Sequence, residues 1–168
     1  MCVKRKYRRT AFGHWEIDTV IGKAHSSEVL LTLDERMTRK RHIVKLPAKT
    51  AQAVAEGLKQ LQKEYGKTWP AVFRTITCDN GSKFAKLPEL FTDTNIYYAH
   101  PYSAWERGTN EKQNSLIRLF FPKGKSFAEI SEEAIRLVED WINHLPRKFL
   151  NYRSPVEVFD AVLFDLAI

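Results

Sequence analysis

The chain has 168 residues, of which 43% are hydrophobic and 12% aromatic, a composition that excludes a disordered protein and fits one domain with a single core. Its formal net charge is +7 and its pI is about 9.4, which indicates a polyanionic partner such as nucleic acid. Two distant cysteines outside any ligand motif predict a reduced, intracellular protein. Because no apolar run reaches transmembrane length and no signal-peptide core follows the basic N-terminus, we expect no membrane contact.

Residues 1–12 are predicted to form a basic arm or linker. Five of the seven excess positive charges lie there, on Lys4, Arg5, Lys6, Arg8 and Arg9. Two further basic patches, at 36–41 and 147–153, are expected to add phosphate contacts.

Three strands are predicted next, at 14–21, 28–34 and 39–46, by their short apolar runs and the turn residues between them. Their short connections indicate an antiparallel meander. In the first strand His14, Glu16 and Asp18 share one face, since side chains alternate along a strand. Glu16 is either an auxiliary carboxylate or one half of a surface salt bridge.

A helix over 51–65 follows, with Thr50 as its N-cap and Gly66 at its end. The apolar run 72–78 then predicts a strand that stops at Asp79. Since strand, helix and strand form a crossover unit, this fourth strand should lie parallel to its neighbour in the sheet. A short helix within 84–92 and a fifth strand at 96–99 complete the middle of the chain.

The segment 101–123 is predicted to enter an amphipathic helix near Thr109. Glu111, Asn114 and Arg118 recur at i, i+3 and i+7 and therefore share one face. The opposite side is apolar, through Leu116, Ile117, Phe120 and Phe121.

Two more helices are predicted in the last third. The first is capped by Ser131 and stopped by Pro146, with a buried stripe that includes Trp141. The second starts at a capping box, Ser154 to Glu157, and runs to about Leu163. The predicted fold is therefore α/β: a five-stranded mixed sheet, its first three strands antiparallel, flanked by helices.

This order of elements can bring Asp18, Asp79 and Glu111 together. Magnesium prefers oxygen ligands, so two or three carboxylates and the substrate phosphate oxygens suffice to bind it. Two such ions about 4 Å apart can activate a nucleophile and stabilise the leaving oxygen of a phosphoryl transfer. Without metal the three carboxylates would repel one another, which makes a purely structural cluster a poor alternative.

Four sequence blocks resemble the catalytic core of transposases of the insertion sequence thirty family, within the retroviral-integrase (RNase H-like) superfamily. They are GHWEIDTVIGK at 13–23, TCDNGSKFA at 77–85, YYAHPYSAWERGTNEKQNSLIRLFFPKG at 97–124 and PRKFLNYRSPVEVF at 146–159. The resemblance implies that residues 13–168 are an integrase-like core. It also implies that Asp18, Asp79 and Glu111 are a DDE triad that binds two Mg²⁺ or Mn²⁺ ions. The implied reaction is cleavage at a transposon end, followed by attack of the freed 3′-hydroxyl on target DNA.

The chain departs from the family at three places. Lys83 stands where the family usually has glutamate, Ser115 stands where glycine is usual, and the link between the second and third acids is shorter. No end-recognising helix-turn-helix region precedes residue 13, so we expect a catalytic fragment or a shortened copy.

Candidate DNA contacts around the triad are Arg107, Asn114, Arg118 and Lys123, with a salt bridge as the alternative for Arg107. The expected partners are transposon-end and target DNA and further copies of the chain, as in a dimer. The expected location is the cytoplasm of a bacterial type of cell, at the nucleoid. Two other functions are compatible with the sequence: an RNase H-like nuclease that does not join strands, and an inactive DNA-binding remnant of a transposase.

Overall fold

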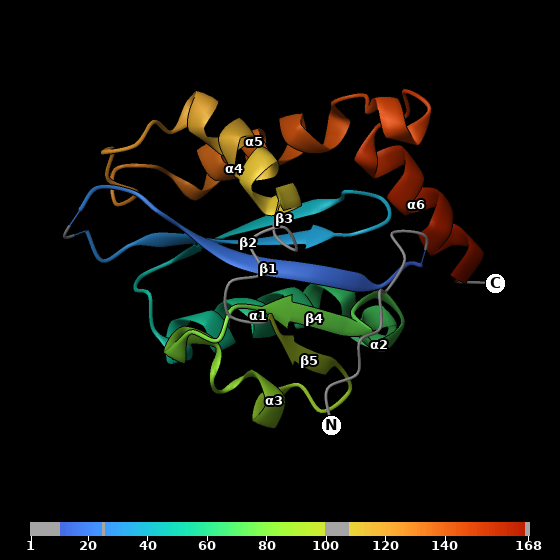
Figure 1. Cartoon of the computed structure of the whole chain (residues 1–168), viewed down its shortest axis with the longest axis horizontal. Helices are drawn as coiled ribbons and strands as arrows, with labels where there is room; N and C mark the ends of the chain where they lie inside the picture. The colour runs from blue at the N-terminus through green and yellow to red at the C-terminus, as the bar shows by residue number, and fades with distance from the viewer. Residues whose placement is uncertain (1–10, 25, 100–107, 167–168) are drawn as a thin grey trace.

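The computed structural model describes residues 11–24, 26–99 and 108–166, with 108–112 described by their backbone alone. Its centre is a five-stranded sheet in the order β3-β2-β1-β4-β5. Helix α1 lies on one side of the sheet, and helices α4 and α5 lie on the other (Figure 1). The predicted α/β architecture with a mixed sheet is therefore confirmed.

The first three strands form the predicted antiparallel meander. They are β1 (His14–Ile21), β2 (Val29–Glu35) and β3 (Arg41–Leu46). The buried carboxylate of Glu35 fixes the β2–β3 turn, since its Oε2 accepts hydrogen bonds from the Met37 and Thr38 amides at 2.9 and 2.6 Å. Its Oε1 accepts one from the Gly13 amide at 3.1 Å, which joins the turn to the start of β1.

Helix α1 (Ala51–Tyr65) has the predicted ends. Thr50 Oγ1 accepts a hydrogen bond from the Ala53 amide at 3.2 Å, and Gly66 follows the helix with a φ of 53°. Its buried face, which includes Val54 and Leu58, packs in one core cluster with Trp15 and Ile17 of β1. This packing makes the crossover by which β4 (Thr75–Cys78) returns parallel to β1.

The predicted strand 72–78 is wrong in its first half. Residues 69–72 form a short helix, α2 (Trp69–Val72), and only 75–78 are strand. Pro70 suits the first turn of a helix, and the helix lets Trp69 stack on Phe73 with ring centroids 3.9 Å apart. Around it lie the short elements η1 (Gly66–Thr68), η2 (Ser82–Phe84), α3 (Leu87–Leu90) and β5 (Asn95–Tyr98).

The last third of the chain is helical, as predicted. It contains α4 (Gly108–Phe120), α5 (Glu132–His144), η4 (Lys148–Leu150) and α6 (Pro155–Leu166). Ile117 of α4 and Ile135, Val138 and Ile142 of α5 pack on Val20, Leu30 and Ile43 of the sheet. Trp141 was wrongly predicted as part of the buried stripe: it is 40% exposed and lies edge-on against Phe120, with ring centroids 4.9 Å apart.

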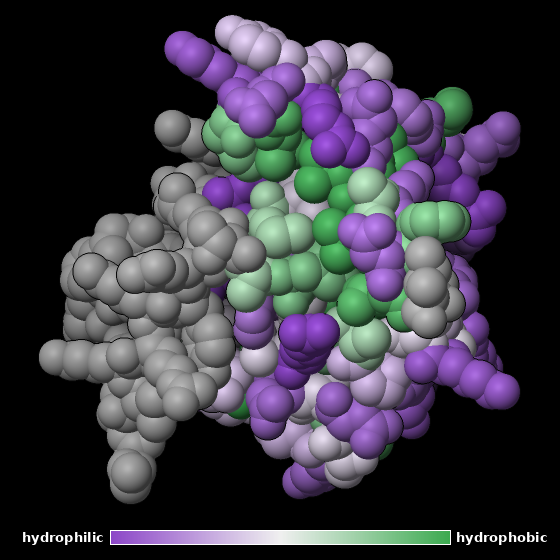
Figure 2. Space-filling model, turned by 90° about the vertical axis from the view of Figure 1, so that its right-hand side faces the viewer, coloured by the Kyte–Doolittle hydropathy of each residue, from purple (hydrophilic) through white to green (hydrophobic). Residues whose placement is uncertain are grey.

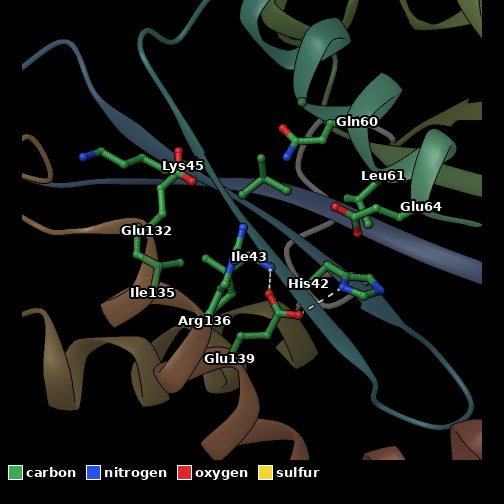
Figure 3. Close-up of a pocket in the computed structure, with 12 residues that line it drawn as sticks. His42, Ile43, Lys45, Gln60, Leu61, Glu64, Glu132, Ile135, Arg136 and Glu139 are labelled. Carbon is green, nitrogen blue, oxygen red and sulfur yellow. Dashed lines mark hydrogen bonds and ion pairs between the residues drawn. The ribbon is translucent and has the colours of Figure 1, made fainter.

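Helix α5 also packs along β3, one of the two edge strands of the sheet. Glu139 Oε2 accepts a hydrogen bond from the Ile43 amide at 2.7 Å, and Asn143 exchanges two with the backbone of Arg41, at 2.8 and 2.9 Å. Figure 3 shows Glu139 reaching from α5 toward Ile43 and His42. These bonds occupy the amide and carbonyl of Arg41 and the amide of Ile43, so this part of the edge strand is not open to pairing with a strand of another chain.

The capping box at the start of α6 is confirmed, because Glu157 Oε2 accepts from the Ser154 amide at 2.6 Å and Ser154 Oγ accepts from the Glu157 amide at 3.4 Å. Phe159 packs against Phe12, so the last residue of the predicted basic arm belongs to the core. Farther along, Phe164 and Leu166 are exposed, and the face that includes α6 carries an apolar area in Figure 2. In the described ranges no helix combines the length and the apolar character needed to cross a membrane.

Candidate active site

Asp18 lies on the face of β1 that α4 covers. Val20, two residues farther along and therefore on the same face, packs in one cluster with Ile117 of α4. Asp18 is partly exposed, and its Oδ1 accepts a hydrogen bond from the Thr19 amide at 2.8 Å. Glu16, on the same face, is paired with Arg36 at 3.2 Å, as in the salt-bridge alternative, but the glutamate is buried and the pair does not lie at the surface.

Asp79 follows directly after β4, the parallel neighbour of β1. The β1–β4 register pairs Glu16 with Thr77, each two residues before an aspartate, so the same register continued along the chain would set Asp18 opposite Asp79. Neighbouring strands are about 4.8 Å apart, so two carboxylates at these positions can share a cation.

The loop after β4 holds the Asp79 carboxylate by both oxygens. Oδ1 accepts a hydrogen bond from the Gly81 amide at 2.9 Å, and Oδ2 accepts one from Lys83 Nζ at 2.8 Å. A Cβ atom at position 81 would lie 2.6 Å from Oδ1, so a larger residue there would push the Asp79 carboxylate out of this position. The sequence marks Lys83 as a departure from the family it resembles, and the structure adds that this residue forms an ion pair with Asp79.

Helix α4 is anchored so that its first turns lie over the same region of β1. Near its start, Arg41 donates to the carbonyl of Gln113 at 2.8 Å; Arg41 is also bonded to Asp34, the register partner of Glu16. Near its end, Arg118 donates to the Ile21 carbonyl at 2.6 Å. Glu111 is in the first turn of α4, two residues before Gln113, while its side chain lies outside the described part of the chain.

The donor chemistry suits a divalent metal ion. The carboxylates of Asp18 and Asp79 offer the hard oxygen ligands that Mg²⁺ and Mn²⁺ prefer. The side chains that the structure describes include no group of three or more potential metal ligands. A triad would need Glu111, so it remains a prediction.

The predicted DNA contacts fall into three groups. Asn114 Oδ1 accepts from Arg41 at 3.1 Å, and Arg118 donates to Ile21, so both already bind within the protein. Lys123 is exposed just after α4. The remaining ones, Arg107 and Lys4, Arg5, Lys6, Arg8 and Arg9 of the arm, lie outside the described residues.

Two of the four basic residues in the patch predicted at 36–41 are not available to DNA. Arg41 is buried in an ion pair with Asp34, and Arg39 is buried with its guanidinium 5.1 Å from the ring centre of Phe149. In the patch at 147–153, Lys148 and Arg153 are exposed, whereas Arg147 is half-buried and donates to the Ile142 carbonyl at 3.3 Å.

A cavity of about 450 Å³ lies away from these carboxylates, where β3, α1 and α5 meet (Figure 3). Three glutamates line it: Glu64, Glu132 and Glu139. Glu139 is engaged by His42 and the Ile43 amide, at 3.1 and 2.7 Å, and therefore serves to hold α5 on the sheet edge.

The sheet order and helix placement are those of the catalytic core of a retroviral integrase, an RNase H-like fold. The catalytic core domain of BIV integrase superposes with a TM-score of 0.69 at 18% identity, over 94% of this chain and all of that one. No protein-family model matches the chain.

In sequence the chain is similar to transposases. It is 41% identical over 155 residues to the transposase for insertion sequence element IS4351 of Bacteroides fragilis, covering 90% of this chain and 46% of that protein. It is 34% identical over 158 residues to transposase InsI for insertion sequence element IS30A of Escherichia coli strain K12, covering 90% and 39%. The resemblance predicted from the sequence blocks is thus confirmed, and the chain spans less than half the length of these relatives.

Proposed function

We propose that this chain is the catalytic core of a DNA transposase, a polynucleotidyl transferase that cuts at transposon ends and joins the freed ends to target DNA. The main support is the position of Asp18 in β1 and of Asp79 directly after β4, the parallel neighbour of β1, with α4 anchored on the face of β1 that carries Asp18. The similarity to transposases over 90% of the chain adds to it.

In this proposal Asp18, Asp79 and Glu111 hold two Mg²⁺ or Mn²⁺ ions. The ions, when bound, supply activation of the attacking oxygen and stabilisation of the leaving oxygen. In the cleavage step a water oxygen attacks phosphorus, and the bond from phosphorus to the 3′-oxygen of the transposon end breaks, leaving a 3′-hydroxyl. In the joining step this hydroxyl attacks a target phosphodiester, whose own 3′-oxygen leaves.

DNA would be held by phosphate contacts around this site. The exposed Lys123 follows α4, and we also assign contacts to Arg107, Asn114, Arg118 and the arm residues 4–9. Asn114 is bonded to Arg41, and Arg118 is bonded to the Ile21 carbonyl, so a DNA phosphate could contact either side chain only by sharing these bonds. Their role is therefore chiefly to orient α4 toward the DNA.

A strand-transfer assay with pre-cleaved ends and Mn²⁺ tests the proposal. The parent chain should give joined products, and Asp18→Asn, Asp79→Asn and Glu111→Gln should each lose them by a factor of about 10² or more. Asp93→Asn, an exposed carboxylate after α3, is the matched control and should keep parent activity. Near-normal joining by any of the three variants would remove that residue from the site.

The same assay separates the two competing functions. A nuclease would give cut but unjoined DNA, and an inactive remnant would give neither product. The ion pair of Lys83 with Asp79 is the observation that favours the remnant, because an ammonium group occupies a predicted metal ligand. Self-association into a dimer and a location at the nucleoid belong to the same proposal, and sedimentation analysis and imaging of a tagged chain test them.

A further inference from the structure

Lys83 places a cation directly on Asp79. It lies four residues after Asp79, in η2, and its Nζ is 2.8 Å from Asp79 Oδ2. The residue is only 9% exposed, and its ammonium group lies 4.6 Å from the centre of the Phe84 ring. The ammonium group is therefore largely shielded from water, whereas the Asp79 side chain is 27% exposed. Partly shielded charges attract more strongly than fully exposed ones.

The local backbone keeps this lysine in position. The Phe84 amide donates to the Gly81 carbonyl at 2.9 Å, which closes the tight turn between the two charged residues. Phe84 itself is fully buried in the main core, so η2 is fixed to the body of the protein. The tight turn and the buried Phe84 therefore fix the backbone of Lys83 next to Asp79.

We propose that the Lys83 ammonium competes with a divalent metal ion for Asp79, an inference that rests on the proposed metal-binding role of Asp79. Both cations would be within a few ångströms of one carboxylate, where like charges repel strongly. Metal can bind through Oδ2 only when the ammonium group leaves it, and the lost ion pair weakens binding. Lys83 therefore sets the metal affinity of the site.

Mn²⁺ titration of the whole chain without DNA, followed by calorimetry, tests this directly. Lys83→Gln should bind Mn²⁺ about tenfold more tightly than the parent, the effect of removing a partly shielded ion pair. Lys83→Arg keeps the charge and should bind as weakly as the parent. Lys86→Gln is the matched control: it removes a lysine three residues away that bonds Gln52 at the exposed surface, and it should stay within twofold of the parent.

The outcomes distinguish this inference from the proposed function. If Lys83→Gln bound Mn²⁺ no more tightly than the parent, the competition would be disproved while Asp79 could still be a ligand. If Asp79→Asn bound Mn²⁺ as the parent does, Asp79 would not be a ligand and the proposed site would fail. In the double variant with Asp79→Asn and Lys83→Gln, the increase in Mn²⁺ affinity that Lys83→Gln causes should be absent. Lys83→Met, which keeps the aliphatic stem over Phe84, replaces Lys83→Gln if the latter does not fold.

Discussion

Arg41 and Asp34 form a two-point ion pair inside the protein. Arg41 Nε lies 2.7 Å from Oδ1 and NH2 lies 2.6 Å from Oδ2, with the two side chains 0% and 2% exposed. The same guanidinium donates to the Gln113 carbonyl at 2.8 Å and to Asn114 at 3.1 Å. One side chain therefore fixes the early turns of α4, where Glu111 is located, to strands β2 and β3.

Arg41→Met should lower the free energy of unfolding by about 3–5 kcal/mol, because it leaves the buried Asp34 charge without its partner. The Gln113 carbonyl would lose its donor as well, so α4 should become less ordered. Urea unfolding followed by circular dichroism measures the first effect. Amide hydrogen exchange in α4 measures the second.

A double variant, with Arg41→Met and Asp34→Leu, is the control for the buried charge. It removes both ions and should recover a large part of the stability, as apolar replacements of buried ion pairs often do. Exchange in α4 should stay fast, since the bond to Gln113 is still missing. Slow exchange in the double variant would show that Arg41 does not hold α4.

Asn143→Leu should expose the outer edge of strand β3. The amide and carbonyl of Arg41 would lose their partners on α5, at a cost of about 1–3 kcal/mol for unpaired buried groups. An open edge should also promote self-association. Thermal unfolding and size-exclusion chromatography at several protein concentrations check both effects.

Asp140→Leu provides the comparison, since it adds a leucine to the exposed face of the same helix. It adds apolar surface without touching the bonds to Arg41. Equal aggregation of the two variants would mean that surface hydrophobicity, and not the strand edge, drives association.

The elements could be predicted from the sequence because local signals define them. Thr50 and Ser131 cap helices, and alternation along 14–21 defines β1. The start of β4 was missed because the apolar run that begins at Val72 fits a strand and a buried helix equally well.

The contacts of the site were less predictable, because they depend on register and on residues far apart in the chain. Asp34 and Arg41 stand opposite each other across the β2–β3 pair, and opposite charges at that spacing are the one signal that could have indicated their ion pair. Asn143 lies 102 residues from Arg41, and no local pattern connects them. The crossover unit predicts that β4 lies parallel to its neighbour in the sheet, and the β1–β4 pairing confirms this.

Stability should depend on pH through His14. Burial, with the nearby charges of Arg36 and Arg74, lowers the pKa of His14 below its usual 6.5, and its Nδ1 lies 2.8 Å from Thr75 Oγ1. Below pH 6.5 the unfolded chain binds more protons at this residue than the folded one. The free energy of unfolding therefore falls as the pH drops from 6.5 through the lowered pKa of His14. The stabilisation that the neutral imidazole provides is fully present above pH 6.5.

Urea unfolding at intervals between pH 8 and pH 5, with NMR titration of the imidazole, measures this dependence. In His14→Gln the part due to this group should be absent, and the slope of stability against pH should be smaller. A His14 imidazole that titrated above 6.5 would contradict the prediction.

DNA binding by this chain should be weak, largely independent of sequence and strongly dependent on salt. Each phosphate that a basic residue neutralises releases condensed counterions, so log affinity falls against log salt by about 0.9 per contact. Deleting residues 1–9 removes Lys4, Arg5, Lys6, Arg8 and Arg9. This should reduce the slope by up to about 4.5 and weaken binding by a similar factor on every DNA sequence.

Fluorescence anisotropy at four salt concentrations, with random duplex and with candidate transposon ends, gives the slopes. Replacing Lys59, Lys63 and Lys67 by glutamine is the charge control, since these lysines lie on or just after α1, across the sheet from α4. It lowers the net charge without touching the arm, so it should change the slope much less per charge removed. The deletion should leave joining of a pre-cleaved end intact at saturating DNA, because Asp18 and Asp79 are retained. Tight binding selective for one end sequence would contradict the prediction and would mean that the core itself recognises transposon ends.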